Sequence, residues 1–493
     1  MNEPLSALTV IVQPMLIAFA LAVGLVPLCR VLAIRLDVVA RPRADRWHRT
    51  VVPLLGGVAI GLSTLFAALL SGLAETLPVI LFASMAVFVM GLVDDMLLLK
   101  PASKLVSQIA IAAALVYFGF RLHWVESRLL DSVFTMVWVV GLTNAFNLLD
   151  NMDGLCAGIA LIVAVMMLAG FWTGVTREDA AAEMALLAIL SGAAAGFLVF
   201  NFPPASIFMG DSGALLFGFA LAALTLGHEG VRASRSDVLS VIAGPAFVLL
   251  IPIFDTTLVT VARLLSGRSP ARGGRDHSSH RLVAIGLSER DAVLVLWALA
   301  SIGGLIGLVL RNFSAAWSMP IGATFLLGMG VFAVYLVRVR VYDEVAVGAA
   351  PATAVTLLPS NYLNKRRVVE VLVDVSLIGA SYYWATRFVF SDPEAYLRNA
   401  EVFYQSLPVI IATQLVAFFA MGLYRGLWRA FVSSDAAIVV KGVIIGTLIA
   451  QVLLFAYYGY PAVSWMVVAI QAAILTTGVV TSRLVSRLFP PGV

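Results

Sequence analysis

Five aspartates of this chain stand in short polar segments that interrupt apolar stretches of membrane length. They are the paired Asp94 and Asp95 of "GLVDDMLLLKPASK", Asp150 and Asp153 of "NAFNLLDNMDGL", and Asp211 of "NFPPASIFMGDSG". Carboxylates suit Mg²⁺, which typically takes one or two of them and completes its shell with water and substrate phosphates. Adjacent aspartates repel each other, and a bound cation relieves that repulsion. The pattern favours a metal site; helix caps and solvated loop charges are the alternative interpretation.

A basic segment later in the chain, "RLLSGRSPARGGRDHSSHRLVAIGLSERD", contains side chains of the kind that bind phosphate. Guanidinium and imidazole groups pair with the oxygens of a pyrophosphate. The alternative is that the segment determines topology or contacts lipid headgroups, as basic loops at membranes commonly do. The candidate phosphate-binding residues are Arg275, His277, His280 and Arg281.

The composition excludes an ordinary soluble protein. Of the 493 residues, 61% are hydrophobic and only 12% are charged, and the mean hydropathy is +0.99. Apolar runs of about 20 residues, each able to cross a hydrocarbon core about 30 Å thick, recur along nearly the whole chain. They are apolar all round and do not alternate, so we predict an all-α polytopic membrane protein and not a β-barrel. Cys29 and Cys156 offer no disulfide or metal pattern, and the first helix lacks a cleavage site, so we expect it to be retained.

The apolar runs predict about fifteen transmembrane helices. Alternating the loops between two sides places most arginines and lysines on one side, which marks the cytoplasmic face. We therefore expect the N-terminus outside and the C-terminus in the cytoplasm. The predicted spans are 8–29, 53–73, 77–93, 104–120, 132–149, 154–174, 183–201, 212–227, 238–262, 291–310, 317–337, 367–389, 404–423, 435–458 and 462–482.

The same alternation places the three aspartate segments and the basic segment together on the cytoplasmic side. Intramembrane carboxylates are costly, so several of them gathered on one face indicate a site. A carboxylate metal site facing a basic loop at a membrane surface suggests that a phosphorylated soluble substrate meets a phosphorylated lipid. Chemistry of that kind depends on charge neutralisation and positioning.

Six motifs in order, over roughly residues 1–340, resemble the polyprenyl-phosphate N-acetylhexosamine-1-phosphate transferases. These are "RWHRTVVPLLGG", "GLVDD", "NAFNLLDNMDGL", "FPPASIFMGDSGALLFG", "PIFDT" and "HSSHRL". The resemblance implies transfer of a sugar-1-phosphate, most simply N-acetylglucosamine-1-phosphate, from a UDP-sugar to undecaprenyl phosphate, with release of UMP. It further implies Mg²⁺ dependence, with Mn²⁺ as a substitute, and a multi-pass protein of the bacterial inner membrane that starts a lipid-linked surface glycan.

The resemblance also assigns roles to individual residues. Asp211 takes the position of the family's chief Mg²⁺ ligand, assisted by Asn147. Asp94 and Asp95 match paired aspartates proposed either to deprotonate the lipid phosphate or to help hold the metal. We favour a single in-line displacement, because a polyprenyl phosphate is already largely dianionic near neutral pH. The catalytic candidates are Asp94, Asp95, Asp150 and Asp153, and the substrate-binding candidates are Lys104, Asn144, Asn201, Phe208, Arg275, His277, His280 and Arg281.

Two departures from the family pattern stand out. The family reads Asp-Gly-x-Asp-Gly where this chain has Asn151 after Asp150; Asn tolerates a left-handed backbone, so we expect the turn to keep its geometry. The histidines of "HSSHR" are spaced apart, whereas the family often holds them adjacent. This second departure is largest against the muramoyl-pentapeptide branch.

The C-terminal third predicts a separate module. Residues 341–366 read as a linker between a transferase domain at 1–340 and a four-helix membrane region at 367–493. That region resembles the membrane anchor of polysaccharide-biosynthesis nucleotide-sugar epimerases and dehydratases, but a Rossmann domain does not follow it here, so no dehydratase activity is expected. As a hypothesis, the bundle docks a glycan-pathway enzyme or forms a homodimer.

Other functions stay open at this point. Within the family, a phospho-N-acetylmuramoyl-pentapeptide transferase or a transferase for a rarer UDP-amino sugar is the alternative. An ion-coupled transporter would place its carboxylates near the midplane and show inverted repeats, neither of which is evident. A non-catalytic membrane scaffold would not need five intact aspartates. The expected partners are a UDP-sugar, undecaprenyl phosphate and membrane lipids, and no nucleic acid.

Overall fold

The structure is a computed structural model of the whole chain. It describes residues 3–40, 51–97, 99–125, 127–173, 180–228, 238–265, 274, 276–312, 315–337, 339, 365–423, 433–458 and 463–488. These residues form two compact units, Met1–Asn312 with Arg340–Asp343, and Phe313–Val339 with Glu344–Val493. Each unit is described by itself.

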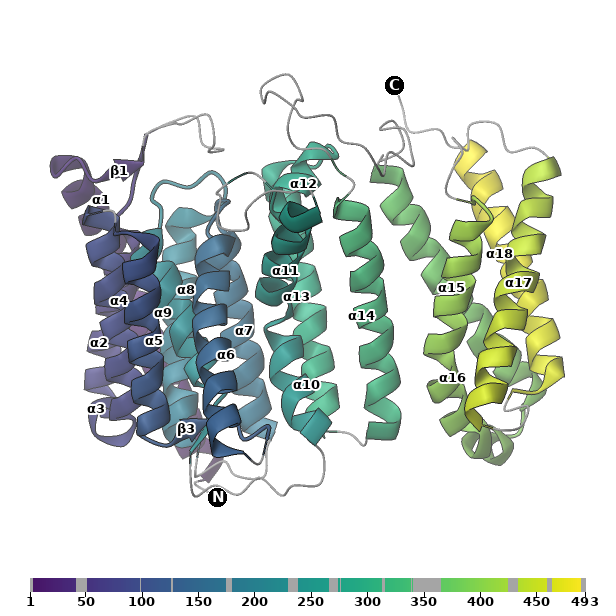
Figure 1. Cartoon of the computed structure of the whole chain (residues 1–493), viewed down its shortest axis with the longest axis horizontal. Helices are drawn as coiled ribbons and strands as arrows, with labels where there is room; N and C mark the ends of the chain where they lie inside the picture. The colour runs from purple at the N-terminus through teal and green to yellow at the C-terminus, as the bar shows by residue number, and fades with distance from the viewer. Residues whose placement is uncertain are drawn as a thin grey trace. The chain divides into compact units, whose positions relative to one another are not determined.

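The first unit is a bundle of helices that run the length of the unit (Figure 1). Apolar segments in lipid form helices, because a helix pairs its backbone groups internally. The helices are α1 (Glu3–Arg35), α2 (Gly56–Leu70), α3 (Leu73–Thr76), α4 (Pro78–Leu97), α5 (Pro101–Tyr117), α6 (Arg128–Leu149), α7 (Leu155–Thr173), α8 (Ala181–Asn201), α9 (Gly210–Ala223), α10 (Val238–Val248), α11 (Leu250–Leu265), α12 (Ser278–Ala284) and α13 (Glu289–Asn312).

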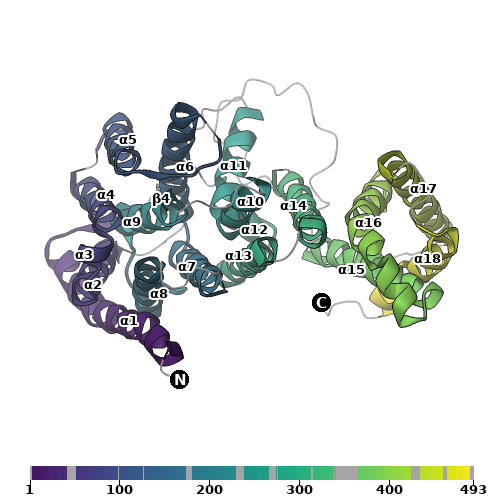
Figure 2. The same cartoon turned by 90° about the horizontal axis from the view of Figure 1, so that it is seen from below.

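Helix α9 occupies the centre of the first unit. It packs against α2, α4, α6 and α7 (Figure 2), and every one of its residues except Asp211 is buried. Close approach of α4 needs Gly91, because a Cβ there would lie 2.6 Å from Ser212 Cα. Small residues at such contacts allow helices to pack closely in membranes. The first turn of α9 is therefore fixed firmly against the end of α4.

The predicted span 238–262 is two helices and not one. Helix α10 ends at Val248 and α11 begins at Leu250. Pro252 lies in the first turn of α11; it lacks an N–H, and its ring collides with the carbonyl four residues back, which breaks the helix at that point. The break sets the direction of α11, the helix that carries Asp255 towards the site.

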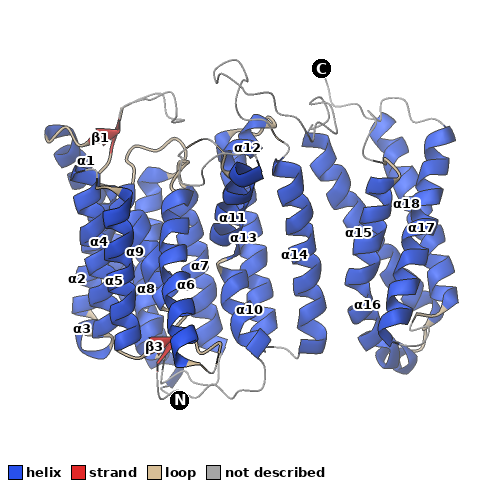
Figure 3. Ribbon diagram, viewed as in Figure 1, coloured by secondary structure: helices blue, strands red, loops and turns tan. Residues whose placement is uncertain are grey.

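Two short antiparallel strand pairs stand at opposite ends of the helices. β1 (Val39–Ala40) pairs with β2 (Val52–Pro53), and β3 (Phe120–Arg121) pairs with β4 (Gly227–His228). β1 and β3 lie at opposite ends in Figure 3, and the N-terminus lies at the end of β3. The end with β1 and α12 is the one that the arginine distribution predicts to face the cytoplasm.

The second unit contains α14 (Ala315–Val337), α15 (Lys365–Val389), α16 (Pro393–Ala420), α17 (Ser433–Tyr458) and α18 (Trp465–Leu488). Its apolar core includes Ile378, Phe418 and Val479, all buried. Inside it Arg483 and Asp374 form a fully buried ion pair between α18 and α15. Helix α14, predicted as the last helix of the transferase domain, packs on α16 in this unit. The predicted domain boundaries stay a prediction, because compact units need not coincide with functional domains.

The protein is a multi-pass, mainly helical membrane protein. Each predicted span corresponds to a helix, apart from the ninth, which is divided. Among the residues that the structure describes, eight helices are long and apolar enough to cross a membrane, and shorter apolar helices accompany them. The predicted number of fifteen spans and the orientation of the termini stay predictions.

Candidate active site

Three of the predicted residues meet where α4, α5 and α9 come together. Lys104 Nζ, from the first turn of α5, donates a hydrogen bond to Asp211 Oδ2 at 2.8 Å and forms an ion pair with Asp94. Asp94 Oδ1 also accepts the backbone N–H of Leu99 at 2.7 Å, in the turn between α4 and α5. Asp94 is buried, whereas the Lys104 and Asp211 side chains are 28% and 30% exposed. A cation thus bridges two carboxylates from different helices, with one side open to solvent.

Asp95 acts as a cap for helix α9. Its Oδ1 accepts the backbone N–H of Asp211 at 2.8 Å, and its Oδ2 accepts the N–H and hydroxyl of Ser212 at 3.0 and 2.7 Å. Gly210 has a φ of 68°, and a Cβ there would lie 2.7 Å from Asp95 Oδ2. A carboxylate at a helix N-terminus satisfies its unpaired N–H groups and complements its dipole. The helix-cap interpretation therefore applies to Asp95, which positions Asp211.

Amide side chains of α6 continue this cluster. Asn147 contacts the Asp211 carboxylate. One turn earlier, Asn144 Nδ2 donates to Gln108 Oε1 at 2.6 Å and to the carbonyl of Val140 at 2.8 Å. Gln108 lies one turn after Lys104 on α5, so the amide pair joins the two helices that carry Lys104 and Asn147. Asn144 thus has a structural contact, and Gln108 was missed, although a buried amide in an apolar helix is a recognisable signal.

The turn after α6 is held by Asp153 and Asn201. Asp153 Oδ2 accepts the backbone N–H of Ala205 at 2.7 Å. Asn201 Oδ1 accepts the N–H of Gly154 at 3.0 Å, and its Nδ2 donates to the carbonyl of Ile207 at 2.9 Å. Asp150 caps the C-terminus of α6. These residues fix the turn 150–154 and the segment 202–209 to each other.

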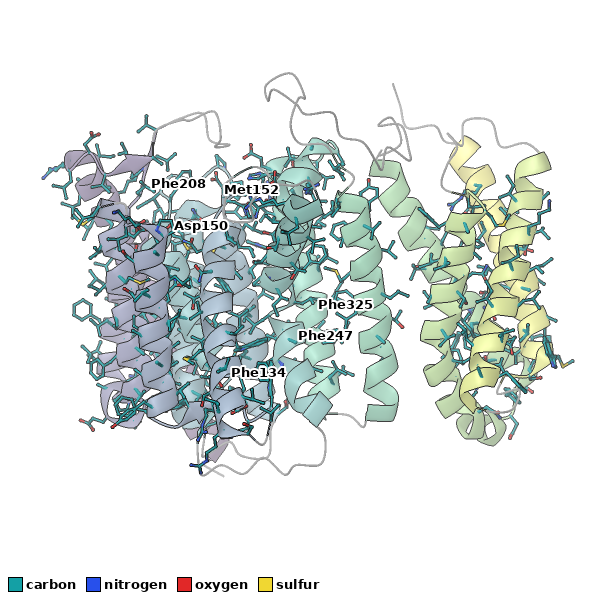
Figure 4. All side chains as sticks on the ribbon, viewed as in Figure 1. Phe134, Asp150, Met152, Phe208, Phe247 and Phe325 are labelled. Carbon is teal, nitrogen blue, oxygen red and sulfur yellow. The ribbon has the colours of Figure 1, made fainter. Side chains whose placement is uncertain are left out.

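Phe208 lies in that second segment and is anchored through its backbone. Its N–H donates to the carbonyl of Pro53 at 2.8 Å, and its own carbonyl accepts the N–H of Gly56 at 2.9 Å. The ring is half-buried. In Figure 4, Asp150, Met152 and Phe208 lie at one end of the first unit, and Phe134 lies towards the other. The nucleotide-pocket candidates therefore share the predicted cytoplasmic end.

The histidine segment, predicted as part of a loop, forms a short helix. Helix α12 begins at Ser278, and Asp255 of α11 accepts three hydrogen bonds at its start. His277 Nδ1 lies 2.7 Å from Asp255 Oδ2, and Asp255 Oδ1 accepts the N–H and the hydroxyl of Ser278 at 2.7 and 2.6 Å. The segment still connects two long helices, and a buried carboxylate 22 residues away in sequence stabilises the first turn of α12. Asp255 was not among the predicted site residues; an aspartate within an apolar span was the available signal.

Arg263, His280 and Arg281 of this segment are buried as well. Arg263 Nε donates to Asp276 Oδ2 at 2.9 Å, and Arg281 Nε donates to the Asp276 carbonyl at 2.6 Å. The His280 and His277 rings meet edge to face, with centroids 6.0 Å apart. Arg281 therefore helps fix α12, and its role in binding phosphate stays a prediction. Arg275 lies outside the described residues.

Asn151 joins the turn after α6 to α12. Its Oδ1 accepts the hydroxyl of Ser279 at 2.6 Å, and its Nδ2 donates to the carbonyl of Leu148 at 2.7 Å. Asn151 is not among the described residues with positive φ, so the expected left-handed backbone is wrong. The side chain, which a glycine would lack, makes the contact. Two of the predicted segments are therefore brought together by a residue that stands where the family pattern has glycine.

Comparisons of the sequence with known proteins match the chain to one family. The model of glycosyl transferase family 4 matches residues 77–228, which include the aspartates from Asp94 to Asp211. A probable undecaprenyl-phosphate N-acetylglucosaminyl 1-phosphate transferase of Bacillus subtilis is 29% identical over 68% of this chain and 92% of its own length. A phospho-N-acetylmuramoyl-pentapeptide-transferase of Lactobacillus gasseri is 27% identical over 55% of this chain and 89% of its own length.

A third relative is the decaprenyl-phosphate N-acetylglucosaminephosphotransferase of Mycolicibacterium smegmatis. It is 34% identical over 54% of this chain and 74% of its own length. The similarity is strong enough, and covers enough of that relative, to assign the family. The chain belongs to glycosyl transferase family 4, the superfamily of polyprenyl-phosphate N-acetylhexosamine-1-phosphate transferases.

Proposed function

We propose that this protein transfers N-acetylglucosamine-1-phosphate from UDP-N-acetylglucosamine to undecaprenyl phosphate, with release of UMP. The observation that carries the proposal is the pair Asp94 and Asp211 bridged by the Lys104 ammonium at the open end of the first unit. Such a cluster can bind both a metal ion and phosphate groups. The names of the Bacillus and Mycolicibacterium relatives support N-acetylglucosamine and a polyprenyl phosphate as the sugar and the acceptor.

The residues present fit Mg²⁺, for which Mn²⁺ would substitute. Among the described residues, no group of three or more His, Cys, Asp and Glu side chains converges on one position. Mg²⁺ needs no such group, because one or two carboxylates suffice when substrate phosphates complete the shell. Asp211, Asn147 and Asp94 would supply hard oxygen ligands, and the Lys104 ammonium marks a place where a cation is stabilised. When bound, Mg²⁺ neutralises charge on the donor diphosphate.

The chain's own residues bind and orient the reactants for one in-line displacement. An oxygen of the lipid phosphate forms a bond to the β-phosphorus, and the bond from that phosphorus to the bridging oxygen breaks. UMP leaves with the bridging oxygen and the electron pair. Lys104 stabilises the crowded phosphate charges, and Asp95 holds Asp211 in place. The lipid phosphate is already largely ionised, so no side chain must remove a proton first.

The donor nucleotide would enter at the turn 150–154 and the segment 202–209. Phe208 would stack on the uracil, while Asp153 and Asn201 hold the turn 150–154 and the segment 202–209 in place. His277 and His280 would approach the diphosphate from α12. This end of the unit would face the cytoplasm of a bacterial inner membrane, where UDP-sugars occur, and the product would start a lipid-linked surface glycan.

The test is UMP release by the purified protein in detergent with undecaprenyl phosphate, Mg²⁺ and a panel of UDP-sugars. We expect UMP only with UDP-N-acetylglucosamine and none after EDTA treatment. Release with another UDP-amino sugar would move the protein to a different pathway with the same mechanism. Release only with UDP-N-acetylmuramoyl-pentapeptide would favour the branch of the Lactobacillus relative. The absence of UMP release with every donor would refute the proposed function.

A further inference from the structure

Two aspartates of the first unit make the same kind of clamp. Asp95 accepts the N–H and hydroxyl of Ser212 and the N–H of the preceding residue, Asp211. Asp255 accepts the N–H and hydroxyl of Ser278, together with the ring Nδ1 of the preceding residue, His277. In both cases a carboxylate of one helix fixes the first turn of another. Asp255 differs in that it also binds the preceding side chain.

The second clamp determines the state of the His277 ring. An ionised carboxylate only accepts hydrogen bonds, so Nδ1 must carry a proton at its 2.7 Å contact with Asp255 Oδ2. Nε2, on the opposite edge of the ring, then faces away from Asp255. Asp255 and His277 are 2% and 5% exposed, so neither side chain turns easily. A histidine held in this way keeps one tautomer and one orientation.

The neighbouring contacts show that α12 does not need His277 for its attachment. Ser278 binds Asp255 through two donors, and Asp276 binds Arg263 and Arg281. The link between Asp255 and His277 is therefore additional to those that hold α12 to α11. What this link adds is the fixed tautomer and orientation of the His277 imidazole.

We propose that Asp255 is a positioning residue for the transfer reaction, holding His277 so that Nε2 meets the donor diphosphate. This inference rests on the proposed function, in which His277 contacts that diphosphate. Asp255 touches neither substrate. Its contact with Ser278 supports α12, and its contact with His277 is the one that bears on the reaction. The effect of its removal on turnover should therefore depend largely on the presence of His277.

The test is a double-mutant cycle on kcat/KM for the UDP-sugar and on the affinity for UDP. Asp255→Asn should lower kcat/KM about 10- to 100-fold, the range found when a metal-ligating histidine loses its carboxylate partner. In the His277→Gln background the same change should have a much smaller further effect, limited to the lost Ser278 contacts, and UDP affinity should follow the same non-additive pattern. Asp255→Glu, which keeps the charge, should recover part of the loss.

Asp276→Asn is the matched control, since Asp276 is a buried carboxylate at the same end of α12 that binds arginine instead of histidine. Its effect should be equal in both backgrounds, and melting temperatures should show that all variants fold. Additive losses from Asp255→Asn and His277→Gln would overturn the inference.

The UDP measurements separate this inference from the proposed function. The protein could bind UDP, with non-additive effects of Asp255→Asn and His277→Gln, and yet release no UMP from any donor. That result would refute the proposed function and support the positioning of His277 by Asp255. UDP affinity unaffected by Asp255→Asn would overturn the positioning role even if UMP is released. Absence of both UDP binding and UMP release would overturn both.

Discussion

Asp95 Oδ1 accepts the backbone N–H of Asp211 at 2.8 Å, so Asp95 positions Asp211. Its neighbour Asp94 shares the Lys104 ammonium with Asp211. Neighbouring residues on a helix point about 100° apart, which lets Asp94 face Lys104 and Asp95 face the start of α9. The paired aspartates therefore have two different structural tasks.

Exchange of Asp95 for Asn should harm both stability and activity. Two backbone N–H groups and a hydroxyl point at this carboxylate, and an amide NH₂ cannot accept from them. Leaving buried donors unsatisfied costs about 1–3 kcal/mol, so the melting temperature should fall along with UMP release. Asp94→Asn, which removes one of the two carboxylate partners of Lys104, should lower activity with a smaller change in melting temperature. Equal melting temperatures for the Asp95 variant and the wild type would contradict the cap.

Replacement of Lys104 by Met should separate metal binding from turnover. The ammonium competes with a divalent cation for Asp94 and Asp211, and a hydrogen bond to a charged group contributes about 1.5–3 kcal/mol. Mn²⁺ titration followed by electron paramagnetic resonance should therefore show affinity raised about tenfold or more. UMP release should nevertheless fall, because a phosphate partner is lost.

Lys100→Met is the control for that experiment. Lys100 is exposed one turn before Lys104, and its loss changes the local charge equally. It should leave Mn²⁺ affinity nearly unchanged. Weaker Mn²⁺ binding by the Lys104 variant would show that the lysine and the metal do not share the carboxylates.

Exchange of Asp211 for Asn should nearly abolish turnover while the protein stays folded. The side chain is the least buried part of α9, so its loss disturbs little packing. A metal ion contributes several kcal/mol to charge stabilisation, which corresponds to a rate reduction of roughly 100-fold or more. UMP release and Mn²⁺ binding, measured beside the melting temperature, test this. Activity near the wild-type level would contradict the assignment of Asp211 as a metal ligand.

The Arg483 and Asp374 pair should dominate the stability of the second unit. Replacement of Arg483 by Met leaves the fully buried Asp374 carboxylate without its cation, and breaking a buried pair costs about 3–5 kcal/mol. Thermal unfolding should shift clearly downwards. The double variant Arg483→Met with Asp374→Leu should recover much of the loss, because no uncompensated charge is left. A double variant as unstable as the sum of both changes would argue against this coupling.

Hydropathy alone predicted the helices well, because a lipid-facing helix is recognisable from one continuous apolar run. The same approach joined α10 and α11, since the break at Pro252 changes no side-chain polarity. It also placed the aspartates at the same end of the helices, because the loops alternate between the two sides of the membrane. It could not reveal that Asp95 caps α9 or that Asp255 starts α12: both contacts join residues distant in sequence. The hydrogen bond between Asn151 and Ser279 could not be predicted for the same reason. An asparagine at this position suggested a special backbone conformation and not a side-chain contact.

On the proposed function, the contact between Asn151 and Ser279 bears on the release of UMP. An uncharged hydroxyl–amide hydrogen bond joins the turn 150–154 to α12, whereas ionic contacts tie α12 to α11. Charged hydrogen bonds are about twice as strong as neutral ones. The turn should therefore part from α12 more readily than α12 parts from α11. On the proposed function, this seam is where the site would open for the nucleotide to leave, while the support of the histidine stays intact.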